Sequence, residues 1–141
     1  MPNVEPAEVT LAELVAAGEA LGADLGPGEV VWLEGDLGAG KTTMVQAIAT
    51  GLGVTEPATS PTYGLVHRYQ GRRGPVFHVD CYRLKHPEEA RDLDWDRLAT
   101  GDAVLVEWPS RAGRWALPPT RRIQLEHAID PTRRRLAIAA G

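Results

Sequence analysis

The most constraining feature of this sequence is the glycine-rich segment over residues 35–42, which matches G-x-x-x-x-G-K-[ST] at every required position. A short apolar run over residues 29–33 precedes the segment, and a helical pattern over residues 41–52 follows it. Strand, glycine turn and helix in that order open a βαβ-type unit. The chain is therefore expected to fold as an α/β domain around a phosphate-binding loop.

The residue types in this loop each have a physical reason. Glycines let the backbone turn so that successive N–H groups point at an anion, and the following helix adds unpaired N–H groups and a positive dipole end. Lys41 is expected to contact the β- and γ-phosphates, and the Thr42 hydroxyl to ligate Mg²⁺. The predicted nucleotide-binding residues of this segment are Gly35, Asp36, Gly38, Ala39, Gly40, Lys41, Thr42 and Thr43.

The rest of the chain predicts a sheet of mixed direction. Thr10 and Glu13 have the spacing of a capping box, so a helix is predicted over residues 10–25. Turn signals predict an antiparallel hairpin and, near the end of the chain, a closing hairpin. The further predicted elements are strands at 62–69, 75–80, 103–107, 121–129 and 133–139, short helices within 88–98, and a loop or short helix at 108–119. We predict one α/β, P-loop NTPase-like domain over residues 1–141, with a mixed parallel and antiparallel sheet flanked by helices.

Composition excludes several classes of protein. A hydrophobic content of 43% argues against disorder, and a net charge of −4 argues against a protein that coats nucleic acid. The single cysteine, Cys81, cannot form an internal disulfide and is expected to be a buried small apolar residue. The four histidines lack metal-ligand spacing, and no apolar run is long enough to cross a bilayer. These features predict a cytoplasmic chain with no membrane partner.

Two carboxylates end predicted strands and are candidates for the metal site. Asp80 and Glu107 each follow four largely apolar residues, so we expect their side chains to emerge at the sheet edge where ligands bind. Spacing alone leaves open which one holds the metal and which one positions water. As an exposed strand-end group, Glu107 is expected to leave no cavity when it is replaced by alanine.

Three other segments carry weaker signals. Hydroxyls of Ser60 and Thr62, in the loop after the second helix, could ligate the metal or cover the γ-phosphate, or simply stabilise a proline turn. Trp108 could stack on a base, face a partner protein or lie in the core. The run Arg133-Arg134-Arg135 could reach a phosphate or an RNA, or form a solvated edge strand.

The loop alone does not identify the reaction. No Asn-Lys-x-Asp segment is present, which disfavours a guanine-specific GTPase and favours ATP. A kinase acting on a small metabolite, with Arg111 and Arg114 as a lid, is the alternative enzyme. A nucleotide-gated binding module without turnover is a third reading.

Four motifs in a fixed order resemble one family. They are residues 35–43 (GDLGAGKTT), 59–63 (TSPTY), 78–84 (HVDCYRL) and 106–109 (VEWP). In this order they resemble the TsaE (YjeE) family, small bacterial P-loop ATPases of tRNA threonylcarbamoyladenosine synthesis. The resemblance extends from the first predicted helix to the last hairpin.

The resemblance implies a function and a set of roles. It implies an ATPase, weak alone, that binds ATP or ADP with Mg²⁺, associates with the TsaD and TsaB proteins, and meets tRNA indirectly through them. It assigns phosphate contact to Lys41, metal binding to Thr42 and Glu107, and support of hydrolysis or coupling to Asp80. Ser60 and Thr62 would belong to a switch-like loop, and Trp108 and Arg133 would lie at the nucleotide.

Overall fold

The structure, a computed structural model, describes residues 4–56 and 65–141. The described residues form a seven-stranded sheet in the order β1-β7-β6-β2-β5-β4-β3. Its strands are β1 (Val4–Thr10), β2 (Glu29–Glu34), β3 (Val66–Gln70), β4 (Pro75–Asp80), β5 (Ala103–Glu107), β6 (Arg121–His127) and β7 (Arg133–Ala140). Its helices are α1 (Leu11–Asp24), α2 (Lys41–Gly51), α3 (Trp95–Leu98) and α4 (Pro109–Ala112), with 3₁₀ turns η1 (Pro87–Ala90) and η2 (Gly113–Trp115).

The sheet has a parallel centre and antiparallel edges. Strands β4, β5, β2 and β6 run parallel to one another, whereas β3 pairs antiparallel with β4, and β7 with both β6 and β1. The predicted mixed sheet and both predicted hairpins are confirmed. Because the central strands are parallel, their carboxyl ends meet at one edge, which is where α/β sheets bind ligands.

Strand β1 was not predicted. Its sequence contains Pro6 and lacks alternation, and most of its residues are exposed. Among the described strands it pairs with β7 alone, with an irregular register between Val4 and Ala7. An edge position tolerates the missing N–H of proline, so β1 depends on its partner strand and not on its own pattern.

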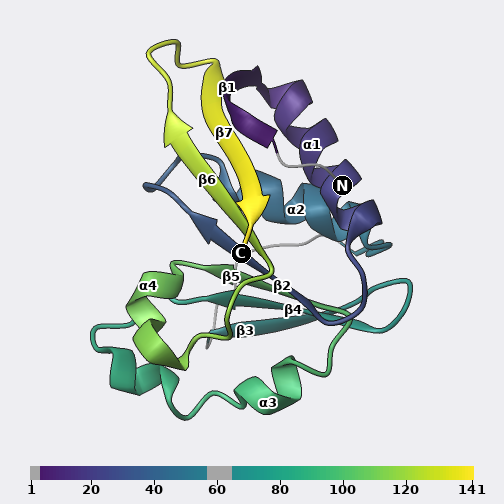
Figure 1. The fold of residues 1–141 in the computed structure, drawn as a ribbon, viewed down its shortest axis with the longest axis vertical. Coiled ribbons are helices and arrows are strands. Elements are labelled where there is room, and N and C mark those ends of the chain that lie inside the picture. The colour runs from purple at the N-terminus through teal and green to yellow at the C-terminus, as the bar shows by residue number, and fades with distance from the viewer. Residues whose placement is uncertain (1–3, 57–64) are drawn as a thin grey trace.

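Helices cover both faces of the sheet (Figure 1), and each face has its own apolar core. On one face, α1 and α2 pack against the sheet and closely against each other. A Cβ added at Gly22 would lie 2.2 Å from the carbonyl oxygen of Ile48, so the two backbones approach too closely for a larger residue. On the other face, the short helices α3 and α4 cover β4 and β5.

Local signals fix where the helices begin. The predicted capping box of α1 is present: Thr10 Oγ1 accepts from the Glu13 N–H, and Glu13 Oε1 accepts from the Thr10 N–H. The helix α3 begins after Asp94, whose carboxylate accepts a hydrogen bond from the Arg97 N–H. Gly40 precedes α2 and has no side chain, so no N-cap side chain accepts a hydrogen bond from the first turn of α2.

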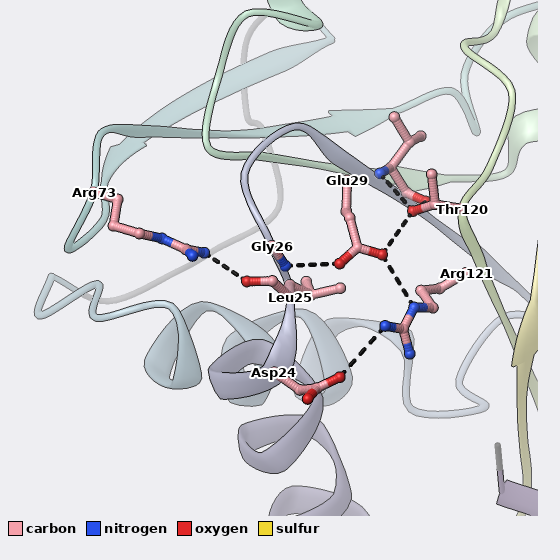
Figure 2. A network of polar contacts seen from close by, with 8 residues as sticks. Asp24, Leu25, Gly26, Glu29, Arg73, Thr120 and Arg121 are labelled. Carbon is pink, nitrogen blue, oxygen red and sulfur yellow. Dashed lines mark hydrogen bonds and ion pairs between the residues drawn. The ribbon is translucent and has the colours of Figure 1, made fainter. Parts of the chain in front are cut away.

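A polar network anchors the amino-terminal end of β2 (Figure 2), and the glycine-rich loop follows the opposite end of that strand. The Glu29 carboxylate accepts hydrogen bonds from the Gly26 N–H, at 2.7 Å, and from Thr120 and Arg121. Arg121 also pairs with Asp24 at the end of α1. The network joins α1, β2 and β6 and so holds the strand that leads into the loop.

Over residues 4–56 and 65–141, no helix combines the length and apolar character that crossing a membrane requires.

Candidate functional site

A cleft of about 660 Å³ opens at the carboxyl ends of the parallel strands. The glycine-rich loop follows β2, Asp80 ends β4 and Glu107 ends β5. Lys41, Thr42 and Thr43 line this cleft together with both carboxylates. The volume falls within the range of small-molecule and cofactor sites. The fold therefore brings together the loop and the two strand-end carboxylates that the sequence singled out.

The loop has the backbone geometry that its glycines predict. Gly35, Gly38 and Gly40 have φ angles of 148°, 75° and 106°, all in the region that favours glycine. At Gly35 a Cβ would also lie 2.0 Å from the carbonyl oxygen of Leu125 on β6, so the loop begins tight against the sheet. The loop then enters α2, whose eleven residues give it an N-terminus that attracts anions.

Lys41 is held inside the loop. It is a buried residue, and its Nζ donates hydrogen bonds to the carbonyl oxygens of Gly35 and Asp36. Burial lowers the pKa of the Lys41 ammonium, and the negative charges of Glu107, Asp36 and Asp80 oppose that shift. The ammonium is thus a partly desolvated cation that feels three carboxylates, and its positive charge can pair with a polyanion.

Asp80 and Glu107 stand side by side. They are register partners on the parallel strands β4 and β5, so their side chains leave the sheet at the same level. Burial raises the pKa of Asp80, and the negative charge of Glu107 raises it further. The backbone N–H of Tyr82 donates to Asp80 Oδ1 at 3.0 Å and partly offsets both effects.

The prediction that Glu107 is an exposed strand-end group is wrong. The residue is only 3% exposed, although it lines the cleft. Its Oε2 lies 2.6 Å from Nε2 of His78, a fully buried residue of the neighbouring strand. The side chain is therefore packed and hydrogen bonded, because β4 lies alongside β5 and supplies a polar partner that the sequence of β5 does not reveal.

One aromatic side chain lies against Lys41, and a second packs on the first. The Trp108 ring lies with its centroid 4.6 Å from Lys41 Nζ and 5.1 Å from the Tyr82 ring. Arg111 lies over both rings. Trp108 has a φ of 55°, the one positive value of a non-glycine among the described residues, and such strain clusters at functional sites. Trp108 thus lies at the lysine end of the cleft, whereas Arg114 stacks on Trp115 elsewhere.

The closing hairpin supplies another wall of the cleft. Pro131, Thr132 and Arg134 line it, and Leu11 and Leu14 of α1 face it as well. The Arg134 guanidinium donates to the carbonyl oxygens of Pro131 and Gly38. Arg133, the arginine named from the sequence, instead pairs with Asp130 at 3.8 Å and does not line the cleft.

The remaining site residues named from the sequence contribute in other ways. The lining of the cleft does not include Gly35, Asp36 or Ala39. These residues shape the loop instead, in which the Ala39 N–H donates a hydrogen bond to the Asp36 carbonyl. Ser60 and Thr62 lie outside the described residues.

Sequence reasoning did not select Tyr82 or His78 as site residues, and within the arginine run it singled out Arg133 instead of Arg134. Tyr82 lies two residues after Asp80, and Arg134 next to Arg133, so each was close to a residue that had been named. His78 carried a usable signal, since it is a polar residue within an otherwise apolar strand.

The donor chemistry of the cleft fits a magnesium ion bound together with a phosphate. A hydroxyl and two carboxylates, from Thr42, Asp80 and Glu107, line one space. Over the described ranges no group of three or more histidine, cysteine or acidic side chains forms a closed metal cage. Mg²⁺ commonly uses one or two carboxylates plus substrate phosphates instead of such a cage.

Comparisons with known proteins agree with this geometry. The family model described as "Threonylcarbamoyl adenosine biosynthesis protein TsaE" matches residues 9–136. A Rickettsia conorii protein named tRNA threonylcarbamoyladenosine biosynthesis protein TsaE is 34% identical over 137 residues, which are 96% of this chain and 74% of that protein. A crystal structure of Bacillus subtilis YdiB superposes with a TM-score of 0.73 at 30% identity, covering 100% of this chain and 90% of that chain.

Two further relatives with the same name match over shorter segments. The Nostoc protein is 43% identical over 67% of this chain, and the Bacillus subtilis protein is 46% identical over 58% of it. The matches span 60% and 51% of the lengths of those two relatives.

Proposed function

The chain belongs to the TsaE family, and on that premise we propose that it is an Mg²⁺-dependent ATPase of tRNA threonylcarbamoyladenosine synthesis. It acts with the TsaD and TsaB proteins and sustains their turnover, and it meets tRNA only through them. The observation that supports this proposal is that one cleft, at the end of the phosphate-binding loop, is lined by Lys41, Thr42, Asp80 and Glu107.

The loop and Lys41 bind the triphosphate. The N–H groups at the start of α2 and the partly desolvated Lys41 ammonium face the cleft, where they stabilise negative charge on the β- and γ-phosphates. The Trp108 ring lies against the ammonium, and the Tyr82 ring packs against Trp108. Arg134, which bridges the closing hairpin and Gly38, supplies a second cation at the wall of the cleft.

Thr42 and Glu107 would hold the metal, and Asp80 would assist hydrolysis. When bound, Mg²⁺ would neutralise charge on the β- and γ-phosphate oxygens. Asp80 lies beside Glu107, and the raised pKa of its carboxyl favours exchange of a proton with an attacking water or with a coupled group.

The test is incubation with ATP labelled at the γ-phosphate, alone and with TsaD and TsaB. The proposal expects label to appear as inorganic phosphate, faster with the partners, and Thr42→Ala to abolish that release. Thr50→Ala is the matched control, because Thr50 lies on the same helix and its hydroxyl donates to the Gln46 carbonyl within that helix. Label on a small metabolite would instead indicate a kinase, and stable binding without release would indicate a nucleotide-gated module.

A further inference from the structure

His78 is the most deeply buried polar residue next to the cleft. It is 0% exposed and lies in the middle of β4, between Phe77 and Val79, which pack into the core on the opposite face of the sheet. A polar ring at such a position is costly unless its nitrogens are hydrogen bonded. Its presence there therefore requires an explanation.

The hydrogen bonding of His78 is incomplete, so stability of the fold alone does not explain a histidine at this position. Nε2 bonds Glu107 Oε2 at 2.6 Å, whereas Nδ1 is buried with no hydrogen-bond partner among the described residues. An apolar side chain of similar size would fill the site without an unpaired nitrogen. What His78 provides, and an apolar residue would not, is the single bond to Glu107.

The geometry of the two strands gives that bond a direction. Asp80 is the register partner of Glu107 at the cleft, and His78 lies two residues earlier on β4, deeper in the sheet. Glu107 is thus held from its inner side at Oε2, which leaves Oε1 as the oxygen that His78 does not engage. The neighbouring Asp80 carboxylate repels that of Glu107, because like charges repel, and the bond from His78 opposes this displacement.

We propose that His78 is a positioning residue that fixes the Glu107 carboxylate so that one oxygen is presented to a divalent cation in the cleft. The inference rests on the proposed function, since it takes Glu107 as a metal ligand. Partners that orient metal-binding groups commonly change metal affinity by about 10- to 100-fold when they are removed. We expect a change at the lower end of that range, about tenfold, because one bond is lost.

The test is calorimetric titration with ADP at a series of Mg²⁺ concentrations, and in EDTA. Three variants separate the effect of losing the His78–Glu107 hydrogen bond from the effect of changing the side-chain volume. His78→Leu removes the bond, His78→Gln retains an N–H at the reach of Nε2, and His78→Asn carries an amide too short to reach Glu107. Phe77→Leu is the control for altered packing of β4 on the other face.

The expected result is that binding in EDTA stays within about twofold of wild type for all variants, whereas the Mg²⁺ concentration for half-maximal enhancement rises about tenfold in His78→Leu and His78→Asn. His78→Gln should restore most of the wild-type value, and Phe77→Leu should not change it. An unchanged Mg²⁺ dependence in His78→Leu overturns the inference. If that variant does not fold, equal Mg²⁺ dependence of His78→Asn and His78→Gln overturns it.

The wild-type titration separates the two proposals. If Mg²⁺ strengthens ADP binding equally in the wild-type protein and in the His78 variants, the proposed function stands and only the role of His78 is refuted. If wild-type binding shows no Mg²⁺ dependence, both the metal assignment of Glu107 and the role of His78 are refuted.

Discussion

Replacing Glu107 by alanine should destabilise the fold as well as impair catalysis. The substitution leaves Nε2 of the buried His78 without its partner 2.6 Å away, and Nδ1 already has none among the described residues. A buried unpaired polar group costs about 1–3 kcal/mol. The lost methylene adds about 0.8 kcal/mol, so we expect a total loss of about 2–4 kcal/mol.

Relief of repulsion with Asp80 opposes this loss, and a second variant removes that ambiguity. Glu107→Gln removes the same charge but keeps the volume and a carbonyl oxygen that accepts from His78. Its stability should be within about 1 kcal/mol of wild type. The difference between the two variants therefore measures the bond and the packing, without the charge.

Urea denaturation followed by tryptophan fluorescence provides the free energies of unfolding. We expect Glu107→Ala to unfold at clearly lower urea than Glu107→Gln, with a melting temperature lower by roughly 10 °C. Both variants should lose Mg²⁺-dependent ATP hydrolysis. Equal stability of Glu107→Ala and wild type would refute the burial and pairing of Glu107 described above.

Three further outcomes follow from contacts at other positions. Gly22→Ala should destabilise the fold by about 2 kcal/mol or more in the same denaturation assay, because a Cβ there meets the carbonyl oxygen of Ile48 on α2 at 2.2 Å. In the control Gly26→Ala, the nearest atom to the new Cβ among the described residues is Glu29 Oε2 at 3.7 Å, an ordinary contact, so the change should be close to neutral. Burial raises the pKa of the Cys81 thiol to about 12. Iodoacetamide at about pH 8 should therefore label this thiol only after unfolding, and rapid labelling of the native protein would contradict its burial. Arg134→Ala should raise the dissociation constant for ADP, measured by calorimetry, about tenfold, because Arg134 lines the cleft. Arg135→Ala should leave that constant unchanged, because the Arg135 side chain is exposed and lies outside the cleft.

Features encoded in contiguous residues could be predicted from the sequence. The glycine-rich loop, the strand before it and the helix after it form one local pattern, and the structure has all three. The capping box at Thr10 and the closing hairpin are likewise local, because caps and turns depend on residues a few positions apart.

Features that depend on residues far apart in the sequence could not be predicted from it. The burial of Glu107 depends on His78, which is 29 residues away, and the strand β1 depends on β7 at the other end of the chain. The choice between Arg133 and Arg134 depends on which way each side chain leaves β7, and adjacent strand residues point to opposite faces. In a run of arginines the sequence offers no signal for that choice.

The central claim is that the cleft binds a nucleoside triphosphate through Lys41. Calorimetric titration of the purified chain with ATP and Mg²⁺, alone and together with TsaD and TsaB, tests this claim most directly. We predict saturable heat for wild-type protein and its loss in Lys41→Ala, while Lys85→Ala, at an exposed lysine away from the cleft, leaves it intact. The absence of heat from wild-type protein under both conditions, or equal binding by Lys41→Ala, would contradict the claim.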